Sequence, residues 1–342
     1  MIAIDSQSLS KADSNGLPEK RPRVLVTGAN GFIGRRFCQC LLDSGQSLRQ
    51  VVRSSPSALA HGEDIVRIED IGPKTNWAAA LPSVDVVVHL AAHVHQMAAP
   101  KKEVDCRYWE VNTLGTERLA EEAAKAGVKR FVYLSSIKVN GEQTEADAQF
   151  TEEQAPQPRD PYGVSKGEAE NRLRSLSFVS GMEVVIIRPP LVYGPGVSAN
   201  FARLLRMVGS GLPLPLASVR NRRSLIFLDN LVDFIVCCLR HPAASGQTFL
   251  VSDGEDLSTP DLIRKLAGAM DRSARLWSCP LSLLRAAGWL LGRSAVIDRL
   301  TGSLRVDSSK AQALLGWRPP YTVAQGIQAT VDAYLRQQHG HD

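Results

Sequence analysis

A tyrosine and a lysine four residues apart are the strongest candidates for chemistry in this sequence. Tyr162 and Lys166 lie in the run Tyr162-Gly163-Val164-Ser165-Lys166, within residues 162–176, whose pattern predicts a helix. Side chains at positions i and i+4 share one face of a helix. Because a neighbouring ammonium stabilises a phenolate, it lowers the pKa of a tyrosine from its usual value of about 10. Such a pair can move a proton while a hydroxyl and a ketone interconvert.

A glycine-rich loop is the second chemical feature. Gly28-Ala29-Asn30-Gly31-Phe32-Ile33-Gly34 follows an apolar strand expected over residues 23–27 and opens a helix expected over 31–42. Glycines at these places allow a tight turn, close backbone approach to a pyrophosphate and close packing of the helix on the strand. The helix N-terminus offers unpaired N–H groups and the positive end of its dipole. The loop therefore predicts a dinucleotide site formed by Gly28, Asn30, Gly31, Phe32, Ile33 and Gly34.

The end of the second expected strand bears on the choice of cofactor. At this position an acidic residue binds the free ribose hydroxyl of NAD, whereas an arginine suits the 2′-phosphate of NADP. The chain reads Val51-Val52-Arg53-Ser54-Ser55, so Arg53 favours NADP(H), with NAD as the alternative. The competing interpretation of Arg53 is a solvated surface side chain.

Strands and helices alternate along the first half of the chain. Strands are expected at residues 23–27, 50–53, 65–68, 84–90, 130–135 and 183–188. Alternation of this kind predicts a parallel sheet covered by helices on both faces. After Arg188, prolines break the pattern, and shorter helices are expected at 230–240, 259–270 and 281–292. We expect an α/β fold: a doubly wound parallel (Rossmann) sheet with a smaller, mostly helical C-terminal lobe. The expected division is a tail at 1–21, a dinucleotide-binding domain at 22–199 and a substrate lobe at 200–338.

The fifth expected strand ends in Leu134-Ser135-Ser136, and sheets of this type bind ligands at the carboxyl ends of their strands. Ser136, Tyr162 and Lys166 together resemble the catalytic triad of the extended short-chain dehydrogenase/reductase superfamily, and specifically its NAD-dependent epimerase/dehydratase family. The spacing of the glycine loop, G-x-x-G-x-x-G, also resembles that family. Further matches are His89-Leu90-Ala91-Ala92, Val111-Asn112-Thr113-Leu114-Gly115-Thr116, the segments 188–196 and 223–231, and Leu315-Gly316-Trp317-Arg318-Pro319.

The resemblance implies roles for individual residues. Tyr162 is implied as the acid and base, Ser136 as the residue that orients the substrate oxygen, and Lys166 as the group that activates the tyrosine and binds the nicotinamide ribose. Further cofactor contacts are implied for Asp70, Ile71, Leu90, Ala91, Ala92, Asn112 and Pro189. Asn200 and Arg223 are implied to contact the diphosphate of a nucleotide-sugar substrate, and Arg222 is the alternative to Arg223.

The residues that follow Ser136 limit which reactions of this family are expected. Dehydratases of this family carry an Asp-Glu pair there, whereas this chain has Ile137 and Lys138, so dehydration is disfavoured. Val139-Asn140-Gly141 departs from the V-Y-G of many 4-epimerases. The run resembles a bacterial subgroup that makes surface polysaccharides such as O-antigen. We rank NADPH-dependent reduction of a UDP-4-keto-6-deoxy-N-acetylhexosamine first and 4-epimerisation of UDP-glucose or UDP-N-acetylglucosamine second. A non-catalytic NADP(H) sensor is disfavoured, because Tyr162 and Lys166 are both present.

Composition and residue spacing argue against several other classes of protein. The 342 residues carry a net charge of +5 with scattered basic residues, which does not indicate a nucleic-acid partner. The six cysteines lack zinc-ligand spacing, and buried reduced thiols in a cytoplasmic enzyme are expected, with no metal. His93 and His95 are expected as packed or solvated loop residues, with substrate contact as the alternative. No run is long enough to span a membrane; residues 280–291 are expected as an amphipathic core helix, with membrane-surface contact as the alternative. A homodimer is left open.

Overall fold

The computed structural model describes residues 21–53, 64–94, 101–145 and 147–339. The expected tail, apart from Arg21, lies outside these residues, as does His95. The described chain forms two compact units. Unit 1 takes the described residues up to Leu134 together with Ser165–Ile186 and Ser245–Gln247, and unit 2 takes Ser135–Val164, Ile187–Ala244 and the described residues from Thr248 onward. The units interleave along the chain, whereas the sequence predicts one boundary between residues 199 and 200.

A seven-stranded sheet has the order β3-β2-β1-β4-β5-β6-β9. Strand β1 lies parallel to β2 and β4, β2 to β3, and β4 to β5, as crossover connections require. The doubly wound parallel sheet expected from the sequence is therefore confirmed. The strands are β1 (Val24–Thr27), β2 (Leu48–Val52), β3 (Ile65–Arg67), β4 (Val86–His89), β5 (Arg130–Leu134), β6 (Glu183–Arg188) and β9 (Thr248–Leu250).

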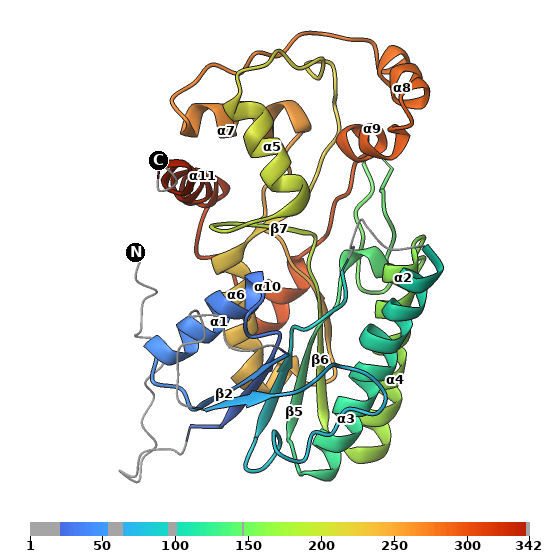
Figure 1. Ribbon diagram of the computed structural model, residues 1–342, viewed down its shortest axis with the longest axis vertical. Coiled ribbons are helices and arrows are strands. Elements are labelled where there is room, and N and C mark those ends of the chain that lie inside the picture. Colours follow the sequence, from blue (N-terminus) through green and yellow to red (C-terminus); the bar gives the residue numbers. More distant parts are fainter. Residues whose placement is uncertain (1–20, 54–63, 95–100, 146, 340–342) are drawn as a thin grey trace. The chain divides into compact units, whose positions relative to one another are not determined.

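The core of unit 1 forms because alternate strand residues face the same helices. Leu25, Val87 and Phe131 on the strands pack in one buried cluster with Leu119 and Leu173 on helices. In Figure 1, α3 and α4 run side by side along the sheet. The helical segments that belong wholly or partly to this unit are α1 (Phe32–Asp43), α2 (Lys101–Arg107), a π-helix (Tyr108–Leu114), α3 (Gly115–Lys125) and α4 (Pro161–Ser180). The π-helix runs directly into α3.

Unit 2 is largely helical, as expected for the C-terminal part of the chain. A second buried cluster joins Phe201, Leu205 and Phe227 to Ile263 and Val331. Strands β7 (Leu191–Tyr193) and β8 (Leu225–Phe227) pair in parallel within unit 2, and β9 and the last two residues of β6 also belong to this unit. Its helices are α5 (Ala199–Gly209), α6 (Leu228–Arg240), α7 (Thr259–Ala269), α8 (Leu281–Leu290), α9 (Ser294–Thr301), α10 (Ser309–Leu315) and α11 (Val323–His339), with short 3-10 helices at Ile137–Val139 and Pro242–Ala244.

Residues 280–291 were expected to form an amphipathic core helix, and α8 packs on the core by a narrow side only. Leu284 belongs to the buried cluster of unit 2, but Leu284 and Gly288 are the only buried residues of this helix. Among the helices in the described part of the chain, none is both long and apolar enough to cross a membrane.

Candidate active site

The turn after β1 has the geometry that its glycines predict. Gly28 has φ +69°, and a Cβ on it would lie 2.8 Å from the backbone nitrogen of Ala91. The N–H of Gly31 donates to the Gly28 carbonyl at 2.9 Å, closing the turn. A Cβ on Gly34 would overlap that same carbonyl, so only glycine lets the first turn of α1 pack this closely.

The N-terminus of α1 is suited to an anion. Its N-cap residue is Gly31, which provides no side-chain cap, and the first turn, described in full, contains no acidic residue. The backbone N–H groups of this turn can therefore hold the pyrophosphate of a dinucleotide, as the glycine pattern predicts. Asn30 beside the turn is exposed, and Phe32 and Ile33 are half-buried.

The residue expected to select the cofactor is already paired. Arg53 follows β2 directly, and its guanidinium lies 3.3 Å from the carboxylate of Asp70. Arg107 at the end of α2 lies 3.1 Å from the other oxygen of that carboxylate. Partial burial by itself would raise the pKa of Asp70, but the hydrogen bond from the N–H of Ile71 and the two arginines outweigh it and lower the pKa. The trio is exposed and carries one net positive charge.

A buried histidine ties the ends of β1 and β4 to α3. Thr27 and His89 are register partners on these strands, and the Thr27 hydroxyl lies 2.6 Å from Nδ1 of His89. Nε2 of His89 lies 3.0 Å from the hydroxyl of Thr116. Because the Thr116 hydroxyl donates to the carbonyl of Asn112 at 2.7 Å, its oxygen must accept from the ring. His89 is therefore the Nε2–H tautomer, and Nδ1 accepts from Thr27.

This histidine is held neutral. Burial, with a smaller contribution from the charge of Lys166, lowers the pKa of His89 to about 3. A neutral ring whose two nitrogens both form hydrogen bonds holds its neighbours in place and does not carry protons. It supports the Leu90–Ala92 segment, whose three residues are half-buried and whose Ala91 N–H points to the Thr27 hydroxyl at 3.4 Å.

Asn112 links the π-helix to the loop after β4 and to α4. Its amide oxygen accepts from the N–H of His93 at 2.7 Å, and its amide nitrogen donates to the His93 carbonyl and to the Ser165 hydroxyl, each at 3.1 Å. Thr113 adds a bond to the Ser165 carbonyl at 2.9 Å. Asn112, expected as a cofactor contact, thus bonds protein groups through both amide atoms and positions α4. Ile71, another expected contact, is buried against Gly115.

Lys166 lies on α4 beneath the end of β5. Its Nζ donates to the Leu134 carbonyl at 2.8 Å and lies 4.5 Å from the centre of the Tyr133 ring. Burial lowers the pKa of Lys166 to about 7, against an opposing effect of Glu170. Tyr162 lies four residues earlier on the same helix, which places it one turn away on the same side.

Ser136 caps the short 3-10 helix that follows β5. Its hydroxyl accepts from the N–H of Lys138 at 3.3 Å. The N–H of the preceding Ser135 donates to the Ile187 carbonyl at 2.7 Å, and the N–H of Ile137 donates to the carbonyl of buried Pro189 at 3.0 Å. Pro189, expected as a cofactor contact, therefore anchors the segment that carries Ser136.

An ion pair connects the Ser136 segment to the start of α4. Lys138 forms a salt bridge with Asp160, which directly precedes the helix. The other oxygen of Asp160 accepts from the N–H of Gly163 at 2.6 Å, as an N-cap does. A Cβ on Gly163 would lie 2.7 Å from the Lys138 carbonyl. These contacts set the position of Ser136 relative to half-buried Tyr162.

The residues expected to bind a substrate diphosphate differ in their surroundings. Asn200 is exposed in the first turn of α5. One guanidinium nitrogen of Arg223 donates to the carbonyls of Arg299 and Gly302, at 3.0 and 3.1 Å. Burial and the charge of Arg299 lower the pKa of Arg223. The neighbouring Arg222 is exposed. Arg223 therefore tethers the end of α9, and Arg222 is the more accessible of the two cations.

Comparison with known proteins can now be set beside this geometry. Residues 24–252 match the model of the NAD dependent epimerase/dehydratase family. The chain belongs to the NAD-dependent epimerase/dehydratase family. It is therefore an enzyme of the short-chain dehydrogenase/reductase type, which confirms the resemblance recognised in the sequence.

Individual members of the family resemble the whole chain. A UDP-glucose 4-epimerase from Vibrio cholerae is 45% identical over 322 residues, covering 93% of this chain and 97% of the relative. An N-acetyl-alpha-D-glucosaminyl-diphospho-ditrans,octacis-undecaprenol 4-epimerase from Escherichia coli O157:H7 is 26% identical, covering 90% and 94%. The crystal structure of a UDP-glucuronic acid 4-epimerase from Bacillus cereus in complex with NAD has a TM-score of 0.75 at 25% identity, covering 94% and 98%.

Some positioning residues of this family member were not singled out from the sequence. Asp160 could have been found, because an Asp followed by a proline at the first helical position is a helix-start signal. Arg107 could not, because it is 37 positions from Asp70 and no local pattern joins them. Asn140, the departure from V-Y-G, is buried and accepts from Arg188 at 2.8 Å.

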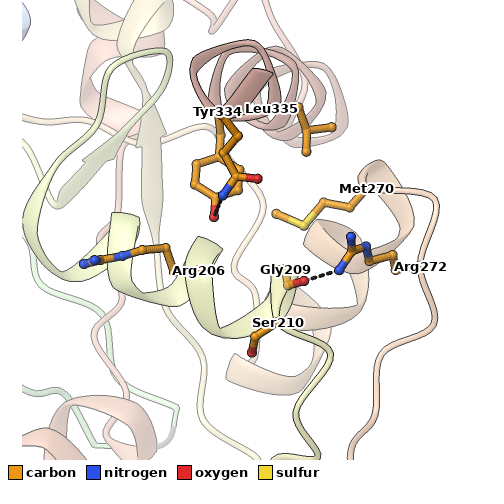
Figure 2. Close-up of a pocket in the computed structure, with 8 residues that line it drawn as sticks. Arg206, Gly209, Ser210, Met270, Arg272, Tyr334 and Leu335 are labelled. Atoms are coloured by element: carbon orange, nitrogen blue, oxygen red, sulfur yellow. Dashed lines mark hydrogen bonds between the residues drawn. The ribbon is translucent and has the colours of Figure 1, made fainter. Parts of the chain in front are cut away.

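A cavity of about 230 Å³ lies elsewhere in unit 2 (Figure 2). Tyr334 of α11 and Met270 line it, and Arg272 donates to the Gly209 carbonyl at its edge. None of the residues expected to bind cofactor or substrate is among its lining residues. Among the described residues, no group of three or more His, Cys, Asp or Glu side chains is arranged to hold a metal ion.

Proposed function

We propose that this enzyme is a UDP-sugar 4-epimerase. The observation that carries the proposal is the 45% identity to the Vibrio cholerae UDP-glucose 4-epimerase over nearly the full length of both chains. The Bacillus cereus UDP-glucuronic acid 4-epimerase supports the same position of reaction on the sugar. The sequence alone ranked reduction of a 4-keto sugar first, and the relatives favour its alternative.

The proposed reaction inverts C4 and leaves the overall oxidation state unchanged. A bound nicotinamide cofactor supplies reversible hydride acceptance at C4. Tyr162, as phenolate, takes the proton of the C4 hydroxyl while the C4 carbon becomes a ketone. After the sugar presents its other face, Tyr162 returns the proton to the new C4 oxygen. Every proton and hydride removed is returned, so the reaction needs no external reductant.

Ser136 and Lys166 support this proton transfer. The Ser136 hydroxyl donates to the C4 oxygen and holds it toward Tyr162. The charged form of Lys166 lowers the pKa of the phenol through its positive charge. With a pKa of about 7 in the unliganded protein, Lys166 gains or loses its proton near neutral pH. A phenolate one turn away favours the charged form, so deprotonation of Tyr162 and protonation of Lys166 are coupled.

The residues present fit a dinucleotide, and we propose NAD as the one retained. The uncapped N-terminus of α1 and the close glycine turn suit its pyrophosphate. The expectation of NADP(H) depended on the charge of Arg53, which is engaged by Asp70. Arg107 leaves one positive charge in that trio, so a 2′-phosphate remains the competing ligand.

The test uses purified protein without added cofactor. We expect UDP-glucose to convert to its C4 epimer, followed by NMR of the sugar, with NAD released when the protein is denatured. UDP-N-acetylglucosamine and UDP-glucuronic acid are the parallel substrates. The enzyme would instead be a reductase if the purified protein contained no bound cofactor, left all three UDP-sugars unchanged, and oxidised NADPH in the presence of a UDP-4-keto sugar.

A further inference from the structure

Helix α8 carries an apolar face that the described chain does not cover. Its buried residues, Leu284 and Gly288, are four positions apart and define the inner side of the helix. This side packs on α9, since a Cβ on Gly288 would lie 2.6 Å from the Ile297 side chain. The opposite side of α8 therefore faces away from its neighbour in unit 2.

The outward side of α8 and the residue after it are rich in large apolar side chains. Leu283 is 59% exposed, Trp289 75%, Leu290 76% and Leu291 72%. Ala286 and Ala287 on the same side are also exposed. A contiguous apolar surface of this kind on a folded protein marks an interaction site more often than chance exposure does.

The charges on and next to α8 are mostly positive. Arg272, Arg275, Arg285 and Arg293 lie within residues 272–297, and the nearest carboxylates in the sequence are Asp271 and the exposed Asp298 on α9. Arg285 and Arg293, within and just beyond α8, are exposed. Helix α8 itself combines leucine, tryptophan and arginine without a carboxylate, which is the composition of helices that lie in the headgroup region of an anionic bilayer.

We propose that α8, with Leu291 and Arg293, docks on the surface of an anionic lipid bilayer. Leu283, Trp289 and Leu290 enter the boundary between headgroups and acyl chains, and the arginines contact lipid phosphates. The helix lies on the bilayer and does not cross it. A second copy of the chain is a poorer partner, because a two-fold interface would bring Arg285 and Arg293 close to their own copies.

The first test measures sedimentation of the full chain with vesicles of phosphatidylglycerol and phosphatidylethanolamine. We expect binding at roughly 0.1 M salt and much weaker binding at roughly 1 M, where charges are screened beyond about 3 Å. Vesicles of phosphatidylcholine alone should bind at least about tenfold more weakly. Equal binding to both vesicle types, or no binding to either at low salt, would overturn the proposal.

Variants then locate the contact. Trp289→Ser/Leu290→Ser should weaken vesicle binding at least about tenfold, since both side chains are exposed and their apolar area would leave water on docking. The matched control is Phe178→Ser/Val179→Ser on α4, whose side chains are 92% and 83% exposed. If the control loses binding as much as the α8 variant, α8 is not the docking surface. Trp289→Phe should keep binding but reduce fluorescence quenching by brominated lipid.

Two further measurements separate this proposal from the others. Epimerase activity on soluble UDP-sugar should be unchanged in the α8 variants, so failure to bind vesicles and failure of the proposed activity are independent results. Molar mass by light scattering should be the same with and without Trp289→Ser/Leu290→Ser. A fall in mass in the variant, without vesicle binding by the parent, would assign α8 to self-association and overturn the proposal.

Discussion

Lys166 and Tyr162 occupy different environments on one helix. The lysine is almost fully buried under Leu134 and Tyr133, whereas the tyrosine lies half-buried in the first turn of α4. A buried ammonium costs desolvation free energy, and the depressed pKa of Lys166 reports that cost. In the proposed mechanism, a phenolate at Tyr162 would favour the charged form of Lys166 against this desolvation, in the same direction as the charge of Glu170.

The first prediction concerns the phenol of Tyr162. Tyr162→Phe keeps the ring but removes the transferable proton, so kcat should fall by roughly 10²–10⁴-fold with little change in Tm. Tyr334→Phe, which removes a hydroxyl from the cavity in unit 2, is the matched control and should retain activity. If Tyr162→Phe kept nearly full turnover, Tyr162 would not be the acid and base of the reaction.

The second prediction separates two adjacent arginines. Arg223→Ala should lower Tm, because it leaves the carbonyls of Arg299 and Gly302 without their donor. Arg222→Ala should leave Tm unchanged and weaken UDP binding by about tenfold or more, the effect of losing a charge-assisted bond. Calorimetry of UDP binding and thermal unfolding measure both. If Arg223→Ala weakens UDP binding at unchanged Tm, Arg223 is the diphosphate contact that the family resemblance implies.

At the scale of elements, the start of α4 joins two parts of the proposed mechanism. Asp160 caps this helix and pairs with Lys138, which follows Ser136 by two residues. The cap holds the first turn, where Tyr162 lies, and the ion pair holds the segment that carries the serine. A change here alters the position of catalytic groups without touching substrate.

The third prediction uses a matched pair of variants at this cap. Asp160→Asn keeps an oxygen for the Gly163 N–H but loses the charge, whereas Asp160→Ala loses both contacts. We expect a loss of stability of about 1 kcal/mol for the alanine variant and a smaller loss for asparagine. The alanine variant should lower kcat more than KM changes, since the reacting groups are displaced. Equal kcat values for both variants and the parent would make the cap purely structural.

The sequence predicts local geometry better than long-range pairing. The glycine loop and the strands were predictable because each depends on adjacent residues: Gly28 needs a positive φ and Gly34 needs the space beside Gly28. The pairing of Arg53 with Asp70 was not predictable, and neither was the exposure of α8. An amphipathic pattern states which residues avoid water but not whether the chain supplies a partner for them.

For the whole molecule, the fold class followed from the alternation of strands and helices, and so did the helical character of the C-terminal part. The division into units did not, because Ser165–Ile186 and Ser245–Gln247 each return to the first unit after a segment that belongs to the second. The order of elements in the sequence does not show that a later segment packs into an earlier unit when the segment between them is itself folded.

The fourth prediction is acid sensitivity of the folded molecule. His89 has a pKa near 3 when folded and about 6.5 when exposed, so the unfolded chain binds the extra proton first as pH falls. The free energy of unfolding should therefore decrease as pH drops from about 6.5 toward 3, by up to a few kcal/mol from this group. Urea unfolding at a series of pH values measures the slope. His89→Gln should be less stable at pH 7 but show a shallower acid slope; an unchanged slope would assign the effect to other groups.

The interleaving of the two units has a consequence for synthesis. A ribosome releases the chain from the N-terminus, so the first 134 residues emerge without the part of α4 and the strand that complete their unit. That unit can close only after residues 165–186, and finally 245–247, have left the exit tunnel. During this interval the apolar strands of the first unit are exposed to other nascent chains. A fragment ending near residue 199 would lack residues 245–247 and would leave the edge of the sheet beside them exposed permanently.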